Sequence, residues 1–228
     1  QGQDIGTILG MSPLNMQITG QITVDKLQNS KADILVDFTN PKSVFANAKE
    51  AIRAGVVPVI GTTGLDSAEI SELEELAKEK KVGVFIAPNF ALGAILMMKF
   101  AEETAKYFKH VEIIELHHDN KLDAPSGTAL KTVEFISQNR QTMMQGHPNE
   151  YEKIPGSRGG NINGIHIHSV RLPGMLAHQE VIFGGLGQTL TIRHDAYSRE
   201  AYMPGVLLAI RKSYKSKDFV LGLEKLLD

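Results

Sequence analysis

The residues best suited to chemistry lie between positions 115 and 129, in the run Glu-Leu-His-His-Asp-Asn-Lys-Leu-Asp-Ala-Pro-Ser-Gly-Thr-Ala. This run places His117, His118 and Lys121 just before a Pro-Ser-Gly-Thr turn. Histidine and lysine side chains can exchange protons near neutral pH when their surroundings tune them. The run is therefore the first candidate for an active site.

The turn predicts a helix from Pro125 to Asn139 that begins with Ser126, Gly127 and Thr128. The unpaired amides at a helix N-terminus, together with the helix dipole, bind carboxylates and phosphates. A glycine there lets a ligand approach the backbone closely. Neighbouring positive side chains favour an anion site, although a simple helix cap would use the same residues.

The histidine pair has a plainer interpretation as well. We predict a strand from Val111 to His118, and adjacent strand residues point to opposite faces of a sheet. Both rings can enter one site only if the strand ends at this point, and Asp119-Asn120 could end it. Otherwise one histidine would be in the core and the other exposed, with Lys121 solvated.

Three apolar runs in the first half alternate with helical patterns. The strands are expected at 34–38, 56–60 and 82–87. Asn40-Pro41 would start a helix that runs to about Ala54, Asp66 and Glu69 would form a capping box, and a third helix would span 91–108. This alternation predicts a parallel sheet that is covered on both faces.

Small polar residues follow each of these strands, in the segments 37–39, 61–64 and 88–90. Right-handed crossovers place the carboxyl ends of parallel strands on one edge, where such sheets bind ligands. Each segment alone could be an ordinary loop, but the three together predict a binding crevice.

The second half has a different pattern. Strands are expected at 165–172, 177–183 and 188–196, with a hairpin at Gly184–Gly187 and a mobile, glycine-rich loop at 146–164. Helices from Met203 to Leu227 would return to the first domain. We thus predict an α/β fold: a Rossmann-type, nucleotide-binding domain (1–88 and 200–228) and an α+β substrate and oligomerisation domain (89–199).

Composition excludes several classes of protein. The 228 residues include 24 basic and 26 acidic ones, a balance that argues against a nucleic-acid-binding protein. The absence of cysteine excludes disulfides, thiolate zinc sites and a cysteine nucleophile, and it fits a cytoplasmic location. We find no targeting segment and no apolar run of the roughly 20 residues that a membrane span needs.

The run from Glu115 to Ala129 resembles the signature Glu-x-His-His-x-x-Lys-x-Asp-Ala-Pro-Ser-Gly-Thr-Ala of the dihydrodipicolinate reductases. The similarity covers essentially the whole chain. It extends to Val36–Thr39, Gly61–Gly64, Ala87–Phe90, Ile167–Arg171 and Ile192–His194.

The resemblance implies reduction of 4-hydroxy-tetrahydrodipicolinate to tetrahydrodipicolinate with NADH or NADPH, in the diaminopimelate route to lysine. It implies that His117 is a proton donor or acceptor and Lys121 a proton donor. The substrate's carboxylates would be bound by His118, Ser126, Gly127 and Thr128. The cofactor would be lined by Gly61, Thr62, Thr63, Ala87, Pro88, Asn89 and Phe90. The resemblance further implies a homotetramer and no metal ion.

The sequence departs from the family at its start. Family members open with a Gly-x-x-Gly-x-x-Gly phosphate finger, whereas Gln1–Gly6 resembles the segment after that unit. Either a strand–helix–strand unit of about 30 residues precedes this sequence, which we expect, or the protein lacks it. The determinants that distinguish NADH from NADPH would lie in that unit.

Two other functions stay open at this point. One is a non-catalytic relative that binds a dicarboxylate without turnover. The other is a metal hydrolase, for which candidate ligands would be His117, His118, His166, His168, His194 and Asp195. The His166-x-His168 spacing places both rings on one strand face, but the sequence holds no His-Glu-x-x-His helix.

Overall fold

The computed structural model describes residues 1–227, and contacts divide the chain into two compact units. The first unit holds Gln1–Ile86 and Ser213–Val220, and the second holds Ala87–Lys212 and the residues from Leu221 onward. Residues 200–212 thus group with the second unit and 213–220 with the first, whereas all of 200–228 was predicted to belong to the first domain. The functional division into two domains stays a prediction.

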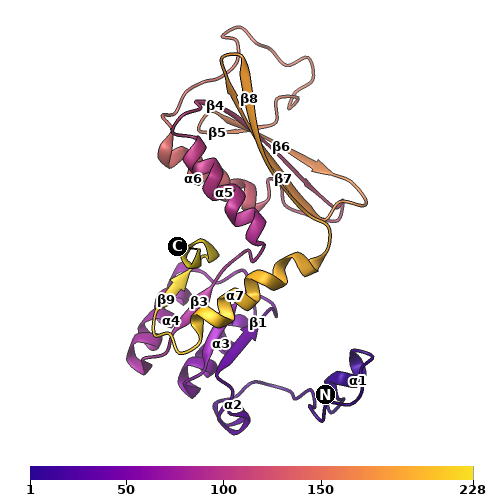
Figure 1. Ribbon diagram of the computed structural model, residues 1–228, viewed down its shortest axis with the longest axis vertical. Coiled ribbons are helices and arrows are strands. Elements are labelled where there is room, and N and C mark those ends of the chain that lie inside the picture. Colours follow the sequence, from indigo (N-terminus) through magenta and orange to yellow (C-terminus); the bar gives the residue numbers. More distant parts are fainter. Residues whose placement is uncertain (228) are drawn as a thin grey trace. The chain divides into compact units, whose positions relative to one another are not determined.

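The first unit is built on a four-stranded sheet in the order β1-β2-β3-β9 (Figure 1). Its strands are β1 (Ile34–Asp37), β2 (Val57–Ile60), β3 (Val84–Ile86) and β9 (Phe219–Leu221), and the first three are parallel. Its helices are α1 (Ile5–Ile8), α2 (Val24–Ser30), α3 (Val44–Ala54) and α4 (Ser67–Lys80). The predicted parallel sheet with alternating helices is confirmed.

The core of this unit forms where α3 and α4 pack on the sheet. β2 is buried along its whole length, and it shares a cluster with Ile52 of α3 and Leu73 of α4. The predicted capping box at the start of α4 is present, because Asp66 accepts from Glu69 N and Glu69 accepts from Asp66 N. Such reciprocal capping fixes where the helix begins.

The second unit is built on a five-stranded sheet in the order β5-β6-β4-β7-β8 (Figure 1). Its strands are β4 (His110–His117), β5 (Gly160–Ile162), β6 (Ile165–Arg171), β7 (Ala177–Gly185) and β8 (Gln188–Ala196). Only β4 and β6 are parallel; the other pairs are antiparallel. The predicted β7–β8 hairpin is confirmed, with Gly187 at a positive φ of 70° in the turn.

Helices α5 (Leu92–Thr104) and α6 (Gly127–Asn139) lie side by side on one face of this sheet (Figure 1). The unit also contains the short helices η1 (Arg199–Tyr202) and η2 (Leu223–Leu226) and the longer α7 (Met203–Ser213). β4 alternates strictly, so that Val111, Ile113 and Glu115 are buried on the helix side.

Several predicted boundaries were wrong. Residues 203–227 are not all helical: α7 ends at Ser213, and β9 follows a turn in which Lys215 has a positive φ of 61°. α3 starts at Val44, because the amides of Ser43 and Val44 first close a turn on Asn40 O. α5 ends at Thr104 instead of residue 108, and the end of the predicted 146–164 loop pairs with β6 as β5.

Candidate functional site

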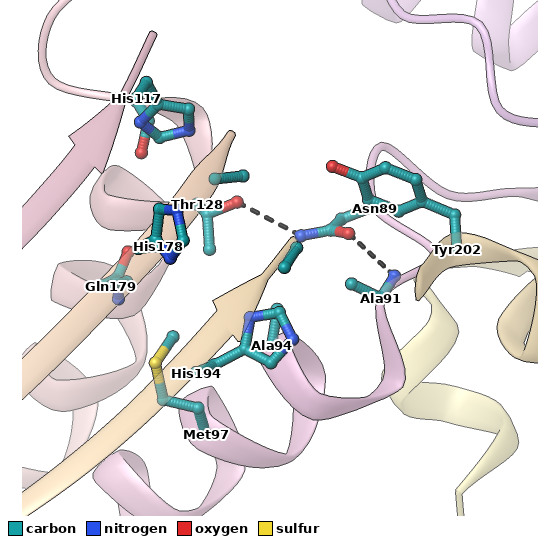
Figure 2. Close-up of a pocket in the computed structure, with 13 residues that line it drawn as sticks. Asn89, Ala91, Ala94, Met97, His117, Thr128, His178, Gln179, His194 and Tyr202 are labelled. Carbon is teal, nitrogen blue, oxygen red and sulfur yellow. Dashed lines mark hydrogen bonds between the residues drawn. The ribbon is translucent and has the colours of Figure 1, made fainter. Parts of the chain in front are cut away.

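One pocket in the second unit gathers most of the polar groups that could do chemistry (Figure 2). It lies among β4, α5, α6, β7 and β8, and no aspartate or glutamate lines it. Its lining residues are Asn89, Ala91, Ala94, Met97, His117, Ser126, Thr128, Ala177, His178, Gln179, His194, Ala196 and Tyr202. Three imidazoles, hydroxyls and amides without a carboxylate make a surface that suits an anionic ligand.

His117 reaches this pocket because it is the last residue of β4, on the same face as the buried Glu115. His118 follows after the strand has ended and is not among the lining residues. The structure therefore separates the pair: one ring contributes to the pocket wall, and the other is half-buried beside it.

The start of α6 supplies backbone donors to the same pocket. Ser126 is the N-cap, and its Oγ accepts from Ala129 N at 3.2 Å, while Leu130 N makes the first helical bond to Ser126 O. The amides of Gly127 and Thr128 lie in the first turn of α6, before that bond, where helix amides have no partner within the helix. Amides in this position, together with the helix dipole, favour a bound anion.

Asn89 joins this helix start to the loop that leads into α5. Its Nδ2 donates to Thr128 Oγ1 at 3.2 Å, and its Oδ1 accepts from Ala91 N at 2.9 Å (Figure 2). Asn89 was predicted to contact the cofactor, and the structure places it in the wall of the pocket that holds His117. It can hold Thr128 in place for a ligand.

Behind the pocket, His117 is hydrogen-bonded to a carboxylate. Its Nδ1 lies 2.5 Å from Glu115 Oε2, and Glu115 has no exposed surface. Arg171 donates to both oxygens of the same carboxylate, from Nη1 to Oε2 at 3.0 Å and from Nη2 to Oε1 at 2.8 Å. Burial raises the pKa of Glu115, but the hydrogen bonds from His117 and Arg171 outweigh it and lower the pKa to about 2.

Lys121 lies in the loop between β4 and α6, outside the set of residues that line the pocket. Its Nζ donates to Asp123 Oδ1 at 2.7 Å, and this bond lowers the pKa of Asp123. The backbone oxygen of Asp123 accepts from Arg171 Nη2 at 2.8 Å. The lysine loop is thus tied to the arginine that also holds Glu115.

Two further histidines complete the pocket. His178 Nδ1 pairs with Asp195 Oδ1 at 2.7 Å, and its Nε2 accepts from Leu176 N at 3.2 Å, so these bonds orient the ring from both sides. Burial lowers the pKa of His194, which favours the neutral form of that ring. His194 packs against Gly93, where a Cβ would lie only 2.4 Å from the ring.

Gln179 is the most deeply buried amide in the wall, with 4% of its surface exposed. Its Nε2 donates to Thr132 Oγ1 at 2.7 Å, and Thr132 Oγ1 donates to Thr128 O at 2.8 Å. Its Oε1 finds no partner within residues 1–227. These bonds connect β7 to the first turn of α6.

In the first unit, the carboxyl ends of β1 and β2 are joined through Asp37. Asp37 Oδ1 accepts from Thr39 N at 2.9 Å and from Thr62 Oγ1 at 2.7 Å. Burial raises the pKa of this carboxyl, but its hydrogen bonds, which include one from Asn47 Nδ2 at 2.8 Å, outweigh it and leave the pKa lowered. The two loops are therefore fixed to each other.

This edge fits a nicotinamide cofactor. Phe38 is half exposed and lies so close to Gly61 that a Cβ there would be 2.1 Å from its ring, so glycine alone permits this arrangement. Open parallel sheets bind dinucleotides at such strand ends. Thr62 is held by Asp37, and Thr63 is exposed beside it.

The other predicted cofactor residues belong to the second unit. The side chains of Ala87 and Phe90 are buried, at 1% and 2% exposure, whereas Pro88 is exposed. Phe90 O lies so close to α7 that a Cβ at Gly205 would be 2.0 Å from it. The side chains of Ala87 and Phe90 thus pack inside the protein, and only their backbone groups could contact a ligand.

Sequence reasoning missed His178 and Gln179, which line the pocket, and gave no role to Glu115 or Arg171, which stand behind it. It considered Asp195, the partner of His178, only as a metal ligand. Glu115 stands two residues before His117, a spacing that puts both side chains on one strand face and could have been noticed. The others depend on how β4, β6, β7 and β8 pair, which a single sequence does not reveal.

The histidines proposed for a metal site are engaged otherwise. His166 Nδ1 bonds Arg158 O at 2.7 Å, and His168 Nε2 bonds Glu112 Oε2 at 2.8 Å. Within residues 1–227 no three potential ligands have an arrangement that could hold a metal ion. Nor does any helix in that range have the length and apolar character to cross a membrane.

Comparison with known proteins agrees with this geometry. Residues 1–90 match the profile of the dihydrodipicolinate reductase N-terminus, and residues 93–227 match that of its C-terminus. The chain is 69% identical over 228 residues to the 4-hydroxy-tetrahydrodipicolinate reductase of Desulfitobacterium hafniense (strain DSM 10664 / DCB-2). It is 55% identical over 227 residues to that of Syntrophomonas wolfei subsp. wolfei. Each match covers 100% of this chain and 85% of the relative.

A solved structure is similar as well: the dipicolinate-bound dihydrodipicolinate reductase from Paenisporosarcina sp. TG-14. It has a TM-score of 0.84 and 46% sequence identity, with coverage of 100% of this chain and 87% of that one. The two profiles together span nearly every residue, the full-length relatives agree, and the pocket has the expected chemistry. The chain belongs to the dihydrodipicolinate reductase family.

Proposed function

We propose that this protein reduces 4-hydroxy-tetrahydrodipicolinate to tetrahydrodipicolinate and water, with NADH or NADPH as reductant, in the diaminopimelate route to lysine. The observation that carries the proposal is the pocket at the start of α6, where His117, Ser126 and Thr128 line a space that has no carboxylate among its lining residues. The family membership of the chain supports the same reaction.

The substrate is a dianion, and the residues around α6 would bind its carboxylates. Gly127 and Thr128 would donate their amides, and the hydroxyls of Ser126 and Thr128 would add hydrogen bonds. His118 would contribute from the rim. Because Asn89 and Ser126 already hold this turn in place, binding would require little ordering of the protein.

Proton transfer would be the task of His117 and Lys121. His117 has Nε2 available, because Nδ1 is bonded to Glu115. Lys121 would leave Asp123, with which it pairs on the surface, to reach the substrate. A positioned acid supplies roughly 10²–10⁴-fold to such reactions.

The family resemblance assigns seven residues to the nicotinamide cofactor: Gly61, Thr62, Thr63, Ala87, Pro88, Asn89 and Phe90. When bound, the cofactor supplies the hydride for the reduction. Asp37 would keep Thr62 and Thr39 in fixed positions beside it.

The test is substrate-dependent oxidation of NADH and NADPH, with binding of dipicolinate measured in parallel by calorimetry. We expect turnover with at least one cofactor, unchanged by a metal chelator, and dipicolinate binding that Thr128→Val weakens. Dipicolinate binding without any turnover would contradict the proposal and indicate a non-catalytic dicarboxylate-binding protein. Loss of activity with the chelator would indicate a metal enzyme.

We further propose that the protein is a cytoplasmic homotetramer that assembles through the second-unit sheet. Helices α5 and α6 cover one face of that sheet, and the other carries half-buried Glu112, Ile114 and Ile182, with no helix of residues 1–227 packed on it as α5 and α6 are on the first. Light scattering should give four times the mass of one chain. A monomer at micromolar concentration would contradict the assembly but not the reaction.

A further inference from the structure

The contacts behind His117 suggest a role for residues that do not line the pocket. Glu115 is wholly buried, and its oxygens accept one bond from the His117 ring and two from the Arg171 guanidinium, with a further side-chain bond from Ser169. Burying a charged pair costs desolvation, and replacing such a pair by apolar residues is often neutral or stabilising. The stability of the fold therefore gives little reason for this arrangement.

The Glu115–Arg171 pair also leaves one buried polar group without a hydrogen bond. Arg171 Nε is buried and has no hydrogen-bond partner within the described chain. A buried donor without a partner is costly. Both terminal nitrogens of the guanidinium donate to Glu115, and Nη2 also donates to Asp123 O at 2.8 Å.

The ionised carboxylate determines which nitrogen of His117 carries the proton. With its pKa lowered to about 2, Glu115 is a carboxylate at neutral pH and can only accept hydrogen bonds. His117 Nδ1 must therefore be the donor, and in the neutral ring Nε2 is left unprotonated. A carboxylate behind a histidine sets its tautomer and orientation in this way.

Arg171 connects this histidine to the loop that carries Lys121. It belongs to β6, directly opposite His117 in the parallel β4–β6 register. From there it holds Glu115 on one side and the backbone of Asp123 on the other, and Asp123 in turn pairs with Lys121. One guanidinium thus supports both groups that would transfer protons.

We propose that Glu115 and Arg171 are positioning residues of the reductase: Glu115 fixes the Nδ1–H tautomer of His117, and Arg171 holds Glu115 and the Lys121 loop in register. Neither would touch the substrate. The inference rests on the proposed function, because it assigns these residues to the proton transfer by His117.

The same strand provides a matched control. Glu112 also pairs with a histidine and an arginine, His168 at 2.8 Å and Arg158 at 2.7 Å. It points to the opposite face of β4, and neither His168 nor Arg158 lines the His117 pocket. Glu112→Gln therefore removes the same kind of charge from the same strand without touching the Glu115–His117 bond. Because Glu112 lies on the face proposed for assembly, light scattering must first show that this variant keeps the oligomeric state of the wild type.

The experiment compares turnover, dipicolinate affinity and pH–rate profiles of Glu115→Gln, Glu115→Asp and Glu112→Gln. An amide at position 115 puts a donor where Arg171 or His117 already donates, so we expect kcat to fall about 10²–10⁴-fold. Dipicolinate affinity should stay within about threefold, because the α6 amides are unchanged. The basic limb of the profile should move to lower pH, since a carboxylate favours the imidazolium.

Glu115→Asp keeps the charge but shortens the reach, so it should retain more activity than Glu115→Gln, and Glu112→Gln should behave as the wild type. Equal losses in Glu112→Gln and Glu115→Gln would overturn the proposal, as would an unchanged kcat in Glu115→Gln. An inactive wild type would instead refute the proposed function. A wild type that depends on His117 but not on Glu115 would refute this inference alone.

Glu115 is fully buried, so its variants could fail to fold. The wild-type tautomer provides a second test that needs no variant at this position. In protein labelled with ¹⁵N-histidine, the His117 signal, assigned by its loss in His117→Gln, should show a protonated Nδ1 and a bare Nε2 once the ring is neutral. A neutral ring protonated on Nε2 would overturn the proposal.

Discussion

Glu115 shows how a single buried charge links stability to pH. Its pKa is lowered from 4.5 to about 2 in the folded protein, because bonds from His117 and Arg171 outweigh the effect of burial. A group with a depressed pKa in the folded state stabilises the fold above its unfolded-state pKa. This contribution is lost as the pH falls from about 4.5 towards 2.

We therefore predict that wild type and Glu115→Gln differ in their pH dependence of unfolding. The difference in unfolding free energy should be about 3 kcal/mol larger at pH 6 than at pH 2. Urea titrations at both pH values measure it. A difference that does not change with pH would mean that Glu115 is not specifically stabilised as a carboxylate.

Replacing Thr128 tests whether its hydroxyl contributes to the proposed anion site. Its Oγ1 accepts from Asn89 Nδ2 at 3.2 Å at the edge of the pocket. Thr128→Val keeps the shape but removes the hydrogen bond, so dipicolinate should bind about 2–10-fold more weakly. Thr189→Val, at the exposed end of β8, is the control and should bind normally. Equal affinity in both variants would exclude the Thr128 hydroxyl from the site.

At this scale the sequence predicted the groups that lie in one run and missed those that lie across the sheet. Of the predicted residues in that run, His117, Ser126 and Thr128 line the pocket, whereas His118, Lys121 and Gly127 are not among its lining residues; their roles stay predictions. Arg171 stands 56 residues after Glu115, and only the parallel β4–β6 pairing brings them together. Such pairing depends on the whole fold and has no local signal.

Among the elements, α4 carries the clearest local signal. Asp66 and Glu69 cap it reciprocally, as their spacing predicts. Asp66→Ala should lower the free energy of unfolding by about 1 kcal/mol, because the amide of Glu69 loses its partner. Ser67→Ala, one position on, should change it little, and turnover should be normal in both. Thermal unfolding of the two variants measures this, and equal stabilities would contradict it.

Other elements could not be predicted because tertiary contacts determine them. Phe219–Leu221 is only three residues long, yet it forms β9 beside β3. β5 is equally short and sits in a glycine-rich segment whose composition is typical of a loop. In both cases pairing with an existing strand supplies the stability that propensity does not.

For the whole molecule, the sequence predicted the parallel sheet of the first half but not how the chain divides between the two units. The continuous apolar strands of the first half indicated that sheet, and the strands and hairpin of the second half indicated an α+β domain, whose sheet is mixed because β4 and β6 are parallel. The grouping of α7 with the second unit follows from contacts such as that of Gly205 with Phe90, where the absence of a Cβ allows close packing.

The most direct test of the account is the turnover of His117→Gln beside that of His110→Gln. Both histidines belong to β4, but His110 is exposed at its start and His117 faces the pocket. We predict that His117→Gln lowers kcat about 10²–10⁴-fold with dipicolinate binding largely kept, and that His110→Gln is fully active. Full turnover in His117→Gln would contradict the assignment of the pocket as the site of proton transfer.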